Sequence, residues 1–372
     1  MLAPDELVSA AKAIFAAPSA DSAARATLLE VKNIRAAPTG AWRLLHFEAP
    51  GYDQPSPPMF GRAPELPAPT VTQTKIWTSR NARLSGRRGL IGEDGSFFLG
   101  GPVRGDADLA RAAAASADGG EGLMLRAKSS TEAQLLVPVT KGERRLTGIG
   151  LHLGAAAGPG ARPFVINQFL ALLLIAELQP RFDYLVLDQA PAELPSLLAE
   201  VGYDGLPVID LDRMQGVICA EIIVPVVSQD GAGWVDRLSS GRLRKFAQHL
   251  LSDLGSEIHP AKCPFFLTTE EGETSPLAGL AAGKGFKVRA IEKRTITDRA
   301  LLMTQASHLA TDCDEGVLAS LFADLAVPLI DFSGTNAAKH LPLLAGRPYA
   351  FAETEDAEAA FAEAGVPELE EA

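Results

Sequence analysis

Residues 263–332 decide the fold of this chain, and they read CPFFLTTEEGETSPLAGLAAGKGFKVRAIEKRTITDRALLMTQASHLATDCDEGVLASLFADLAVPLIDF. Short apolar runs alternate here with segments of helical period; the runs are 264–267, 286–291, 307–311 and 327–331. Strand-length and helix-length patterns that alternate in this way are typical of a parallel sheet covered by helices. The stretch therefore predicts an α/β domain.

Polar or acidic clusters follow the predicted strands of this stretch. They are Thr268-Thr269-Glu270, Glu292-Lys293 and the segment 312–316. In open α/β sheets, ligands bind outside the carboxyl ends of the strands, at the point where the strand order reverses. We therefore expect half of any functional site at this edge.

A second α/β block precedes the first one along the chain. The predicted elements are a helix at 164–178, a strand at 184–187, a helix at 192–201, a strand at 206–211, two strands within 217–227 separated at Pro225, and a helix at 234–254. Two such blocks joined by the polar segment 255–262 indicate two Rossmann-like halves facing a cleft. We expect an N-terminal half over 1–254, a C-terminal Rossmann-like domain over 255–350, and a helix with an acidic tail over 351–372.

The N-terminal half begins with a strand-rich leader over 30–153. Its predicted strands are 30–35, 41–47, 71–79, 82–91, 96–99, 123–126, 133–137 and 146–153. The segment 49–69 holds seven prolines. Because proline has no backbone N–H and a fixed φ, this segment is predicted to be an irregular surface excursion or a linker.

Composition excludes several classes of protein. A chain of 372 residues with 47% hydrophobic content is long enough for two domains with real cores, and its net charge of −12 disfavours nucleic acid as a partner. The three cysteines show no CxxC spacing, which predicts buried free thiols. The most apolar run, 164–178, is too short to span a bilayer. We expect a protein without a transmembrane segment, located in the cytoplasm.

Three stretches carry a resemblance to a known family. They are ARLSGRRGLIGEDGSFFLGG at 82–101, NQFLALLLIAELQPRFDYLVLD at 167–188 with LLAEVGYDGLPVIDLD at 197–212, and GKGFKVRAIEKRTITDRALLMTQASHLATDCDEGVLASLFA at 283–323. In element order and length the chain resembles the family 61 glycosyltransferases of the bacterial capsular-polysaccharide type. The resemblance implies a GT-B fold with two Rossmann-like domains. It also implies transfer of a sugar from a nucleotide-sugar donor to a saccharide acceptor in surface-polysaccharide or glycan assembly, alongside other polysaccharide-assembly proteins.

The resemblance also implies positions for the site. Where the family has His-Gly-Ala-Gly-Leu-Thr-Asn, this chain reads Asp-Glu-Gly-Val-Leu-Ala-Ser over 314–320, and the arginine that ends the first strand of the family's second domain is replaced by threonine. The donor-binding candidates implied are Thr268, Thr269, Asp314, Glu315, Gly316 and Ser320. Asn167 and Gln168 stand in place of an Asn-Tyr pair, on the acceptor side, and are followed by Phe169 and Leu170 instead of His-Trp.

These departures keep other functions open. One alternative is a catalytically degenerate relative that binds a sugar or a protein partner as a scaffold. Another is a Rossmann-type binding module for a different nucleotide. A competent transferase requires a donor pocket at 312–320, whereas a scaffold does not.

A nucleotide-sugar donor needs its diphosphate neutralised. Backbone N–H groups at the start of a helix favour anions, and Gly316 is a candidate for this role. Asp312, Asp314 and Glu315 would repel a diphosphate unless a metal intervened. Asp312-Cys313-Asp314 matches the DxD pattern that binds manganese in other glycosyltransferases, but a solvated acidic turn is the alternative, and we expect no resident cofactor.

Lys284, between two glycines, would reach a phosphate or would simply end a helix as a solvated lysine.

A glycosyl transfer also needs a general base to deprotonate the acceptor hydroxyl. Asp188, directly after the predicted strand 184–187, is one candidate, and a helix N-cap is the alternative role. His152 is the other candidate, because it ends a strand beside glycines such as Gly148 and Gly150 that predict a turn.

Arg242, Arg244 and Lys245 would line a cleft for an anionic saccharide or form a solvated helix face.

Overall fold

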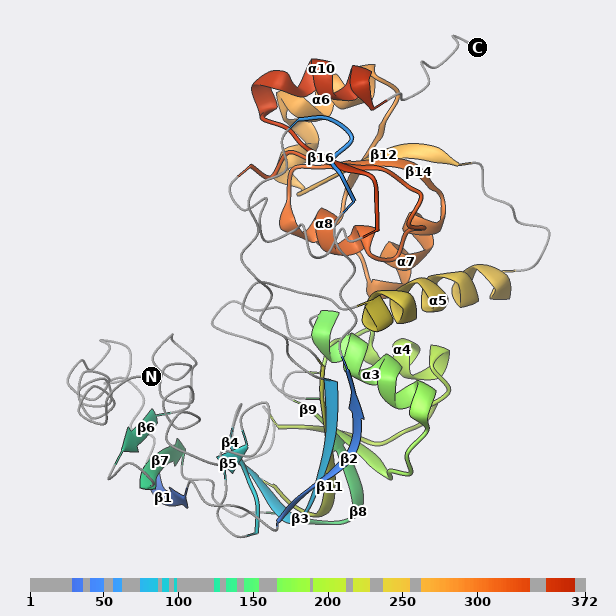
Figure 1. The fold of residues 1–372 in the computed structure, drawn as a ribbon. Helices are drawn as coiled ribbons and strands as arrows, with labels where there is room; N and C mark the ends of the chain where they lie inside the picture. The colour runs from blue at the N-terminus through green and yellow to red at the C-terminus, as the bar shows by residue number, and fades with distance from the viewer. Residues whose placement is uncertain are drawn as a thin grey trace. The chain divides into compact units, whose positions relative to one another are not determined.

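A computed structural model describes part of the chain. The described residues are 29–35, 41–49, 56–61, 74–85, 89–93, 97–98, 124–127, 132–138, 144–153, 166–187, 190–211, 217–227, 237–254, 262–334 and 346–364. The chain divides into two compact units (Figure 1). Unit 1 comprises Met1–Glu48 and Thr74–Val227, and unit 2 comprises Ala49–Gln73 and Ser228–Ala372.

This division differs in two places from the boundary expected at residue 254. Helix α5 (Arg237–Asp253) belongs to unit 2, because it packs against helix α7 (Ile296–Thr304) of that unit. The proline-rich excursion also belongs to unit 2, although the strands on both sides of it belong to unit 1.

Unit 2 is built on a five-stranded parallel sheet with the order β13-β12-β14-β15-β16. Its strands are β12 (Cys263–Thr268), β13 (Lys287–Ala290), β14 (Ala306–Thr311), β15 (Leu329–Asp331) and β16 (Tyr349–Phe351). The first four strands confirm the four apolar runs of the sequence. The fifth strand, β16, was not anticipated, because three residues give too short a pattern to detect.

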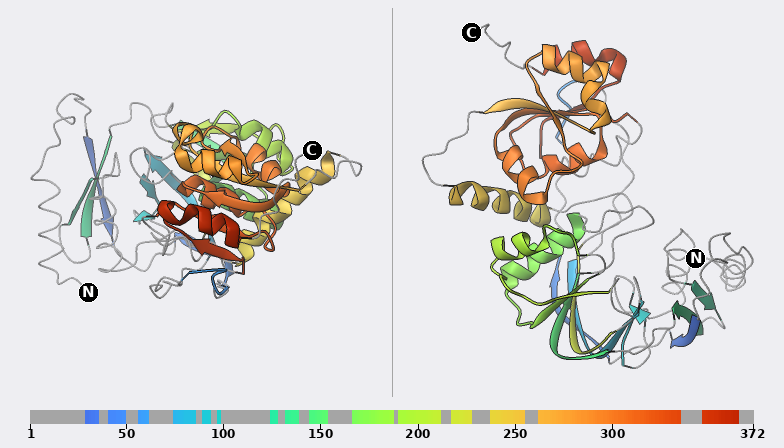
Figure 2. Two further views of the ribbon diagram at one scale, coloured as in Figure 1. Left: turned by 90° about the horizontal axis from the view of Figure 1, so that it is seen from above. Right: turned by 180° about the vertical axis from the view of Figure 1, so that it is seen from behind.

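Helices cover both faces of this sheet. Helix α6 (Pro276–Gly283) and helix α10 (Ala357–Glu363) lie on one face, and helices α7 and α8 (Asp314–Ser320) lie on the other (Figures 1 and 2). The core beneath α6 and α10 contains Phe266, Phe286, Phe332 and Phe361. Phe361 contacts Phe286 and Phe332 with ring centroids 5.0 and 5.3 Å apart. This three-layer arrangement buries the near-continuous apolar runs that parallel strands require.

Unit 1 contains an eight-stranded mixed sheet with the order β10-β9-β8-β11-β3-β4-β5, and β2 also pairs with β3. The strands are β2 (Trp42–Glu48), β3 (Thr74–Ser85), β4 (Gly89–Ile91), β5 (Phe97–Phe98), β8 (Arg144–His152), β9 (Tyr184–Leu187), β10 (Val208–Asp210) and β11 (Val217–Val226). Strands β8 to β11 run parallel, and β3 joins them antiparallel to β11. The predicted α/β character is therefore confirmed for both units.

Two helices follow strands of the parallel part of unit 1. Helix α3 (Ile166–Leu178) comes after β8 and contacts β11, and helix α4 (Leu194–Glu200) comes after β9. A separate three-stranded antiparallel sheet consists of β1 (Leu29–Arg35), β7 (Glu132–Pro138) and β6 (Met124–Ala127). In the part of the chain that the structure describes, no helix has the length and apolar character needed to cross a membrane.

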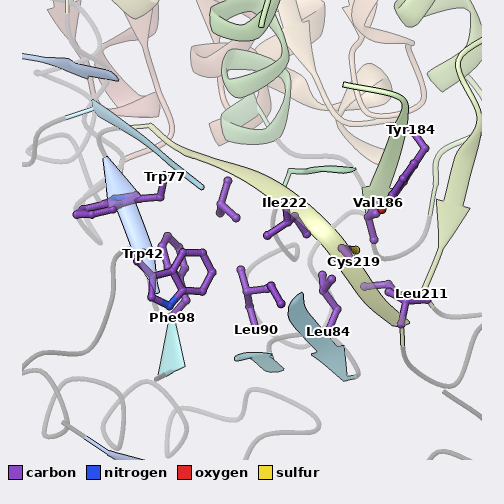
Figure 3. Packing of buried hydrophobic residues seen from close by; sticks show 13 residues of the cluster. Trp42, Trp77, Leu84, Leu90, Phe98, Tyr184, Val186, Leu211, Cys219 and Ile222 are labelled. Carbon is purple, nitrogen blue, oxygen red and sulfur yellow. The ribbon is translucent and has the colours of Figure 1, made fainter. Parts of the chain in front are cut away.

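The core of the mixed sheet gathers large side chains from several strands (Figure 3). Trp42 and Phe98 approach with ring centroids 4.5 Å apart, and Cys219 is buried in the same cluster as a free thiol. Cys313 is also a buried free thiol and Cys263 is a half-buried one, so no disulfide links these residues.

Two sequence predictions for unit 1 were wrong. Strand β11 is continuous through Pro225, which pairs with Ile76 of β3. Pairing of β11 with β8 ends at Ile223, so the missing N–H of Pro225 breaks no ladder on that side. Gly148 and Gly150 lie inside β8 rather than in a turn: Gly148 has a φ of +83°, and a Cβ on Gly150 would lie 2.7 Å from the ring of Tyr184.

Candidate functional site

The strand order of unit 2 reverses between β12 and β14, and polar side chains meet at that point. Thr268, the last residue of β12, is fully buried, and its hydroxyl donates a hydrogen bond of 3.0 Å to Oδ2 of Asp312. Asp312 directly follows β14. A reversal of strand order in a parallel sheet is where α/β proteins bind ligands. The carboxyl edge of β12 and β14 is therefore the candidate site.

Asp312 is held in an unfavourable setting for an ionised carboxylate. Partial burial raises the pKa of its carboxyl, and the hydrogen bond from Thr268 opposes that rise. The other oxygen, Oδ1, is buried and makes no hydrogen bond with any residue that the structure describes. Oδ1 is therefore a buried acceptor that lacks a donor among the described residues.

The loop after β12 folds tightly against the site. The amide of Gly272 donates to Oγ1 of Thr269 over 3.1 Å, and a Cβ on Gly272 would lie 2.0 Å from the hydroxyl oxygen of Thr268. Only glycine leaves room for this approach. Ser275 then caps α6, because its hydroxyl accepts a hydrogen bond of 3.1 Å from the amide of Ala278.

Two loops at this edge are joined by acidic side chains. A carboxylate of Glu292 accepts from the amide of Glu270 over 3.2 Å, and a carboxylate of Glu273 accepts from the amide of Ala290 over 3.0 Å. Lys293 forms an ion pair with Glu270, and this contact raises the pKa of the lysine. The loops after β12 and β13 are thereby fixed to each other beside Thr268.

Helix α8 begins at the same edge and packs directly on the sheet. Gly316 is buried, and a Cβ there would lie 2.0 Å from Oγ1 of Thr311 and 3.1 Å from Cβ of Leu267. Oγ1 of Thr311 in turn accepts a hydrogen bond of 3.2 Å from the amide of Cys313. The requirement for glycine at position 316 is thus explained by close helix–strand packing.

Carboxylates dominate the candidate site. Asp314 and Glu315 occupy the first turn of α8, and Asp331 ends β15 on the next strand, where its Oδ1 accepts from the amide of Ser333 over 2.8 Å. Cys313, which lies between Asp312 and Asp314 in the sequence, is unreactive at neutral pH, because burial raises the pKa of its thiol to about 11. The negative charge of these carboxylates disfavours the binding of an anionic group at this edge unless a cation binds with it.

Two predicted donor-binding residues lie away from this edge. Lys284 follows the end of α6, just before β13 begins, and therefore lies at the amino edge of the sheet. Gly285, with a φ of +86°, completes the turn there. Ser320 is the last residue of α8, is fully buried, and donates its hydroxyl to the carbonyl of Val317 over 2.7 Å. The structure thus brings Thr268, Thr269, Asp314, Glu315 and Gly316 together, without Lys284 and Ser320.

Arg347 was not anticipated from the sequence, although it fixes the far end of α8. Its buried guanidinium donates to the carbonyls of Ser320, Val327 and Ala323 over 2.9, 2.9 and 3.0 Å. Burial lowers its pKa to about 10, so it remains a cation at neutral pH. Arginine is the side chain whose planar fork can satisfy several carbonyls at a helix C-terminus.

In unit 1, His152 ends β8 at another reversal of strand order, between β8 and β11. It lies opposite Val186 in the parallel ladder, on the sheet face that carries the large core cluster. Only 7% of its surface is exposed, and burial lowers its pKa to about 4. The imidazole is therefore neutral at pH 7, and its buried Nδ1 has no hydrogen-bond partner within the described part of the chain.

The remaining predicted residues of unit 1 are partly described. Asn167 and Gln168 lie in the first turn of α3, where Gln168 is 3% exposed. Asp188 lies outside the described residues.

On α5 of unit 2, Arg242 is buried, so the prediction of a solvated position was wrong for this residue. It shares a helical stripe with Ser239 and Phe246, which are also buried. Arg244 is half-buried, and Lys245 is exposed.

Aspartates at 312 and 314 do not form a recognisable metal centre with their neighbours. Within the described ranges, no three His, Cys, Asp or Glu side chains gather as a group that could hold a metal ion.

Comparisons with known proteins assign this chain to no family. A scan against protein-family models and a search of curated proteins gave no match to this chain.

Proposed function

We propose that this chain is a glycosyltransferase-like protein whose unit 2 binds a nucleotide-sugar donor at the carboxyl edge of β12 and β14. The observation that carries the proposal is the hydrogen-bonded pair of Thr268 and Asp312 at the reversal of strand order. Open α/β sheets bind their ligands at such a reversal, and nucleotides are common among those ligands. The resemblance to family 61 glycosyltransferases supports a sugar nucleotide as the ligand and a GT-B fold for the chain.

The chemistry of the edge suits hydroxyl groups better than phosphates. The exposed carboxylate of Asp314 and the half-buried carboxylate of Glu315 are groups that accept hydrogen bonds from the hydroxyls of a ribose or a sugar. Asp314 and Glu315 would repel a diphosphate, so the proposal requires a divalent cation bound together with the donor or a diphosphate directed away from α8. Manganese is the cation to test first, because of the Asp312-Cys313-Asp314 pattern.

In the proposed reaction, the bond between the sugar's anomeric carbon and the donor phosphate breaks, and the nucleoside diphosphate leaves with the electron pair. The acceptor oxygen bonds to the anomeric carbon and gives up its proton to a base. His152 of unit 1 is one candidate: its imidazole is neutral at pH 7, but only 7% of its surface is exposed, so the acceptor would reach it only after the surrounding side chains move. Asp188 is the second candidate, and Asn167 and Gln168 are proposed to contact the saccharide acceptor.

Thermal unfolding of the full chain tests this proposal. It is measured with uridine, guanosine, thymidine and cytidine nucleotide sugars, each with and without Mn²⁺. Binding to the native state alone raises the melting temperature, and the Thr268→Val variant is expected to reduce that rise. Release of nucleoside diphosphate with a saccharide acceptor then distinguishes transfer from binding. If no donor changes the melting temperature under either condition, the transferase proposal fails.

A second candidate function is a degenerate relative that binds a saccharide or a protein partner without transferring sugar. The acidic edge of unit 2 favours it, because carboxylates bind sugar hydroxyls yet oppose a free diphosphate. This function predicts a rise in melting temperature with saccharides and none with nucleotide sugars. A rise with nucleotides that carry no sugar would instead indicate a binding module for another nucleotide.

A further inference from the structure

One short segment of the N-terminal half lies on the edge of the unit 2 sheet. Residues 56–61 are described, and the amide of Met59 donates a hydrogen bond of 2.7 Å to the carbonyl of Tyr349, the first residue of β16. In Figure 1 this segment is the blue trace beside β16. We refer to residues 56–61 as the strap.

The strap runs in the same direction as β16. The amide of Met59 is bonded to Tyr349, and a Cβ added to Gly61 would lie 3.9 Å from the carbonyl oxygen of Phe351. Residue numbers therefore rise in the same direction along the strap and along β16, so the two segments are parallel. The strap continues the parallel order of the sheet past its last strand, and it covers part of an edge that would otherwise expose unpaired backbone groups.

Side chains of the strap also join the core of unit 2. Met59 and Phe60 pack against the cluster that contains Phe332 and Phe361. Both strap side chains are only half-buried. The strap thus adds apolar contacts to the layer formed by α10 without being enclosed by it.

Both ends of the excursion that carries the strap are anchored in unit 1. Glu48 ends β2 and Thr74 begins β3, and these two residues face each other in the antiparallel ladder. The chain therefore leaves unit 1 and returns to the same place after visiting unit 2.

The contacts that hold the strap are few. Pro57 and Pro58 have no backbone N–H, so the strap cannot form a complete ladder with β16. Within residues 56–61, Met59 donates a hydrogen bond to the sheet, and the side chains of Met59 and Phe60 are half-buried against the core. These interactions are a small part of the free energy that stabilises a domain, and weakly held segments open without global unfolding.

We propose that the strap is a detachable element that leaves β16 while the sheet and core of unit 2 remain folded. This inference is independent of the proposed glycosyl transfer. The released state exposes the β16 edge and the apolar surface under Met59 and Phe60.

Amide hydrogen exchange of the full chain, followed by NMR, tests the proposal. The amide of Met59 is expected to exchange at least tenfold faster than that of Leu309, which donates to Pro328 inside the sheet. Urea at concentrations below the unfolding transition should leave the Met59 rate nearly unchanged, because local opening exposes little surface. Equal rates for Met59 and Leu309 with the same urea dependence would overturn the proposal, because the strap would then open only with unit 2.

A pair of variants sharpens the test. Phe60→Ser removes strap packing while keeping the Met59 donor, and it should accelerate exchange at Met59 at least tenfold with the Leu309 rate unchanged. Phe47→Ser is the matched control, since Phe47 lies on β2 of unit 1 and is 50% exposed. An unchanged Met59 rate in Phe60→Ser, or acceleration of Leu309 together with Met59, would contradict a detachable strap.

Discussion

The hydroxyl of Thr268 lies 3.0 Å from Oδ2 of Asp312, although 44 residues separate the two along the chain. The contact joins the ends of β12 and β14, the two neighbouring strands between which the order of the unit 2 sheet reverses. It also partly offsets the effect of burial on the pKa of Asp312. The pair is the centre of the site proposed for this protein.

Removing the hydroxyl at position 268 should change the titration of its partner. Thr268→Val preserves shape but removes the donor, so the pKa of Asp312 is expected to rise further above its ordinary value. The free energy of unfolding should fall by about 1–3 kcal/mol at pH 7, because a buried acceptor loses its partner. NMR titration of the Asp312 carboxyl and urea unfolding measure the two effects.

Thr268→Ser keeps the hydroxyl and is the control for this experiment. It should leave the pKa of Asp312 close to that of the wild type. An identical titration in the valine and serine variants would show that the hydrogen bond does not hold the carboxylate.

Gly316→Ala should destabilise unit 2. An added Cβ would lie 2.0 Å from Oγ1 of Thr311 and 2.8 Å from its Cβ, and both atoms belong to the central strand β14. Overpacking of this kind costs about 1–3 kcal/mol, and occasionally more. Chemical denaturation measures the change.

Gly279 of α6 provides the matched control, because nothing lies within 4 Å of its Cβ position and it is exposed. Gly279→Ala should be neutral or should stabilise the protein by up to about 1 kcal/mol. A Gly316→Ala variant as stable as Gly279→Ala would refute the close packing of α8 on the sheet.

Burial of His152 should make the protein sensitive to acid. Its folded pKa is about 4, against an ordinary value of 6.5, so the unfolded chain binds more protons between these two values. Stability conferred by the neutral form is therefore present above pH 6.5 and is lost as the pH falls towards 4, by about 3 kcal/mol in total. His152→Gln should remove this part of the pH dependence of unfolding.

His249→Gln is the control, since His249 is an exposed residue of α5. It should keep the acid-induced loss of stability that His152 causes. A His152→Gln variant with the wild-type slope between pH 4 and 6.5 would argue against a buried neutral imidazole.

Arg347→Met should destabilise the end of α8. The substitution leaves the carbonyls of Ser320, Ala323 and Val327 without their donor, at a cost of about 3 kcal/mol if each lost hydrogen bond counts for about 1 kcal/mol. Arg347→Lys should fall between Met and the wild type, because an ammonium group lacks the planar fork. Equal stabilities of the Met variant and the wild type, measured by thermal unfolding, would exclude the capping role.

Local patterns predicted the strands of the unit 2 sheet well. The apolar runs at 264–267 and 307–311 lie inside β12 and β14, and the run at 184–187 matches β9 in unit 1. Each is short, apolar and bounded by turn residues, so periodicity and length are sufficient. Because polar residues follow the strands directly, the carboxyl edge could also be located from the sequence.

Long-range features could not be predicted from such patterns. The docking of residues 56–61 on β16 and the contacts of Arg347 with carbonyls 20 to 27 residues away depend on tertiary packing. Proline content marked the excursion as irregular but gave no information about where it lies. Similarly, Gly316 suggested an anion site, whereas its missing side chain accommodates Thr311.

The carboxyl edge of β12 and β14 is the proposed binding site of the nucleotide-sugar donor. The most direct test is amide hydrogen exchange of the full chain with each nucleotide sugar at saturating concentration, with and without Mn²⁺. At least one donor is predicted to slow exchange over residues 268–275 and 311–316, with Lys284 and Ser320 unaffected, and Asp312→Asn is predicted to weaken that effect. Slowed exchange confined to other segments, or no slowing with any donor, would contradict the claim.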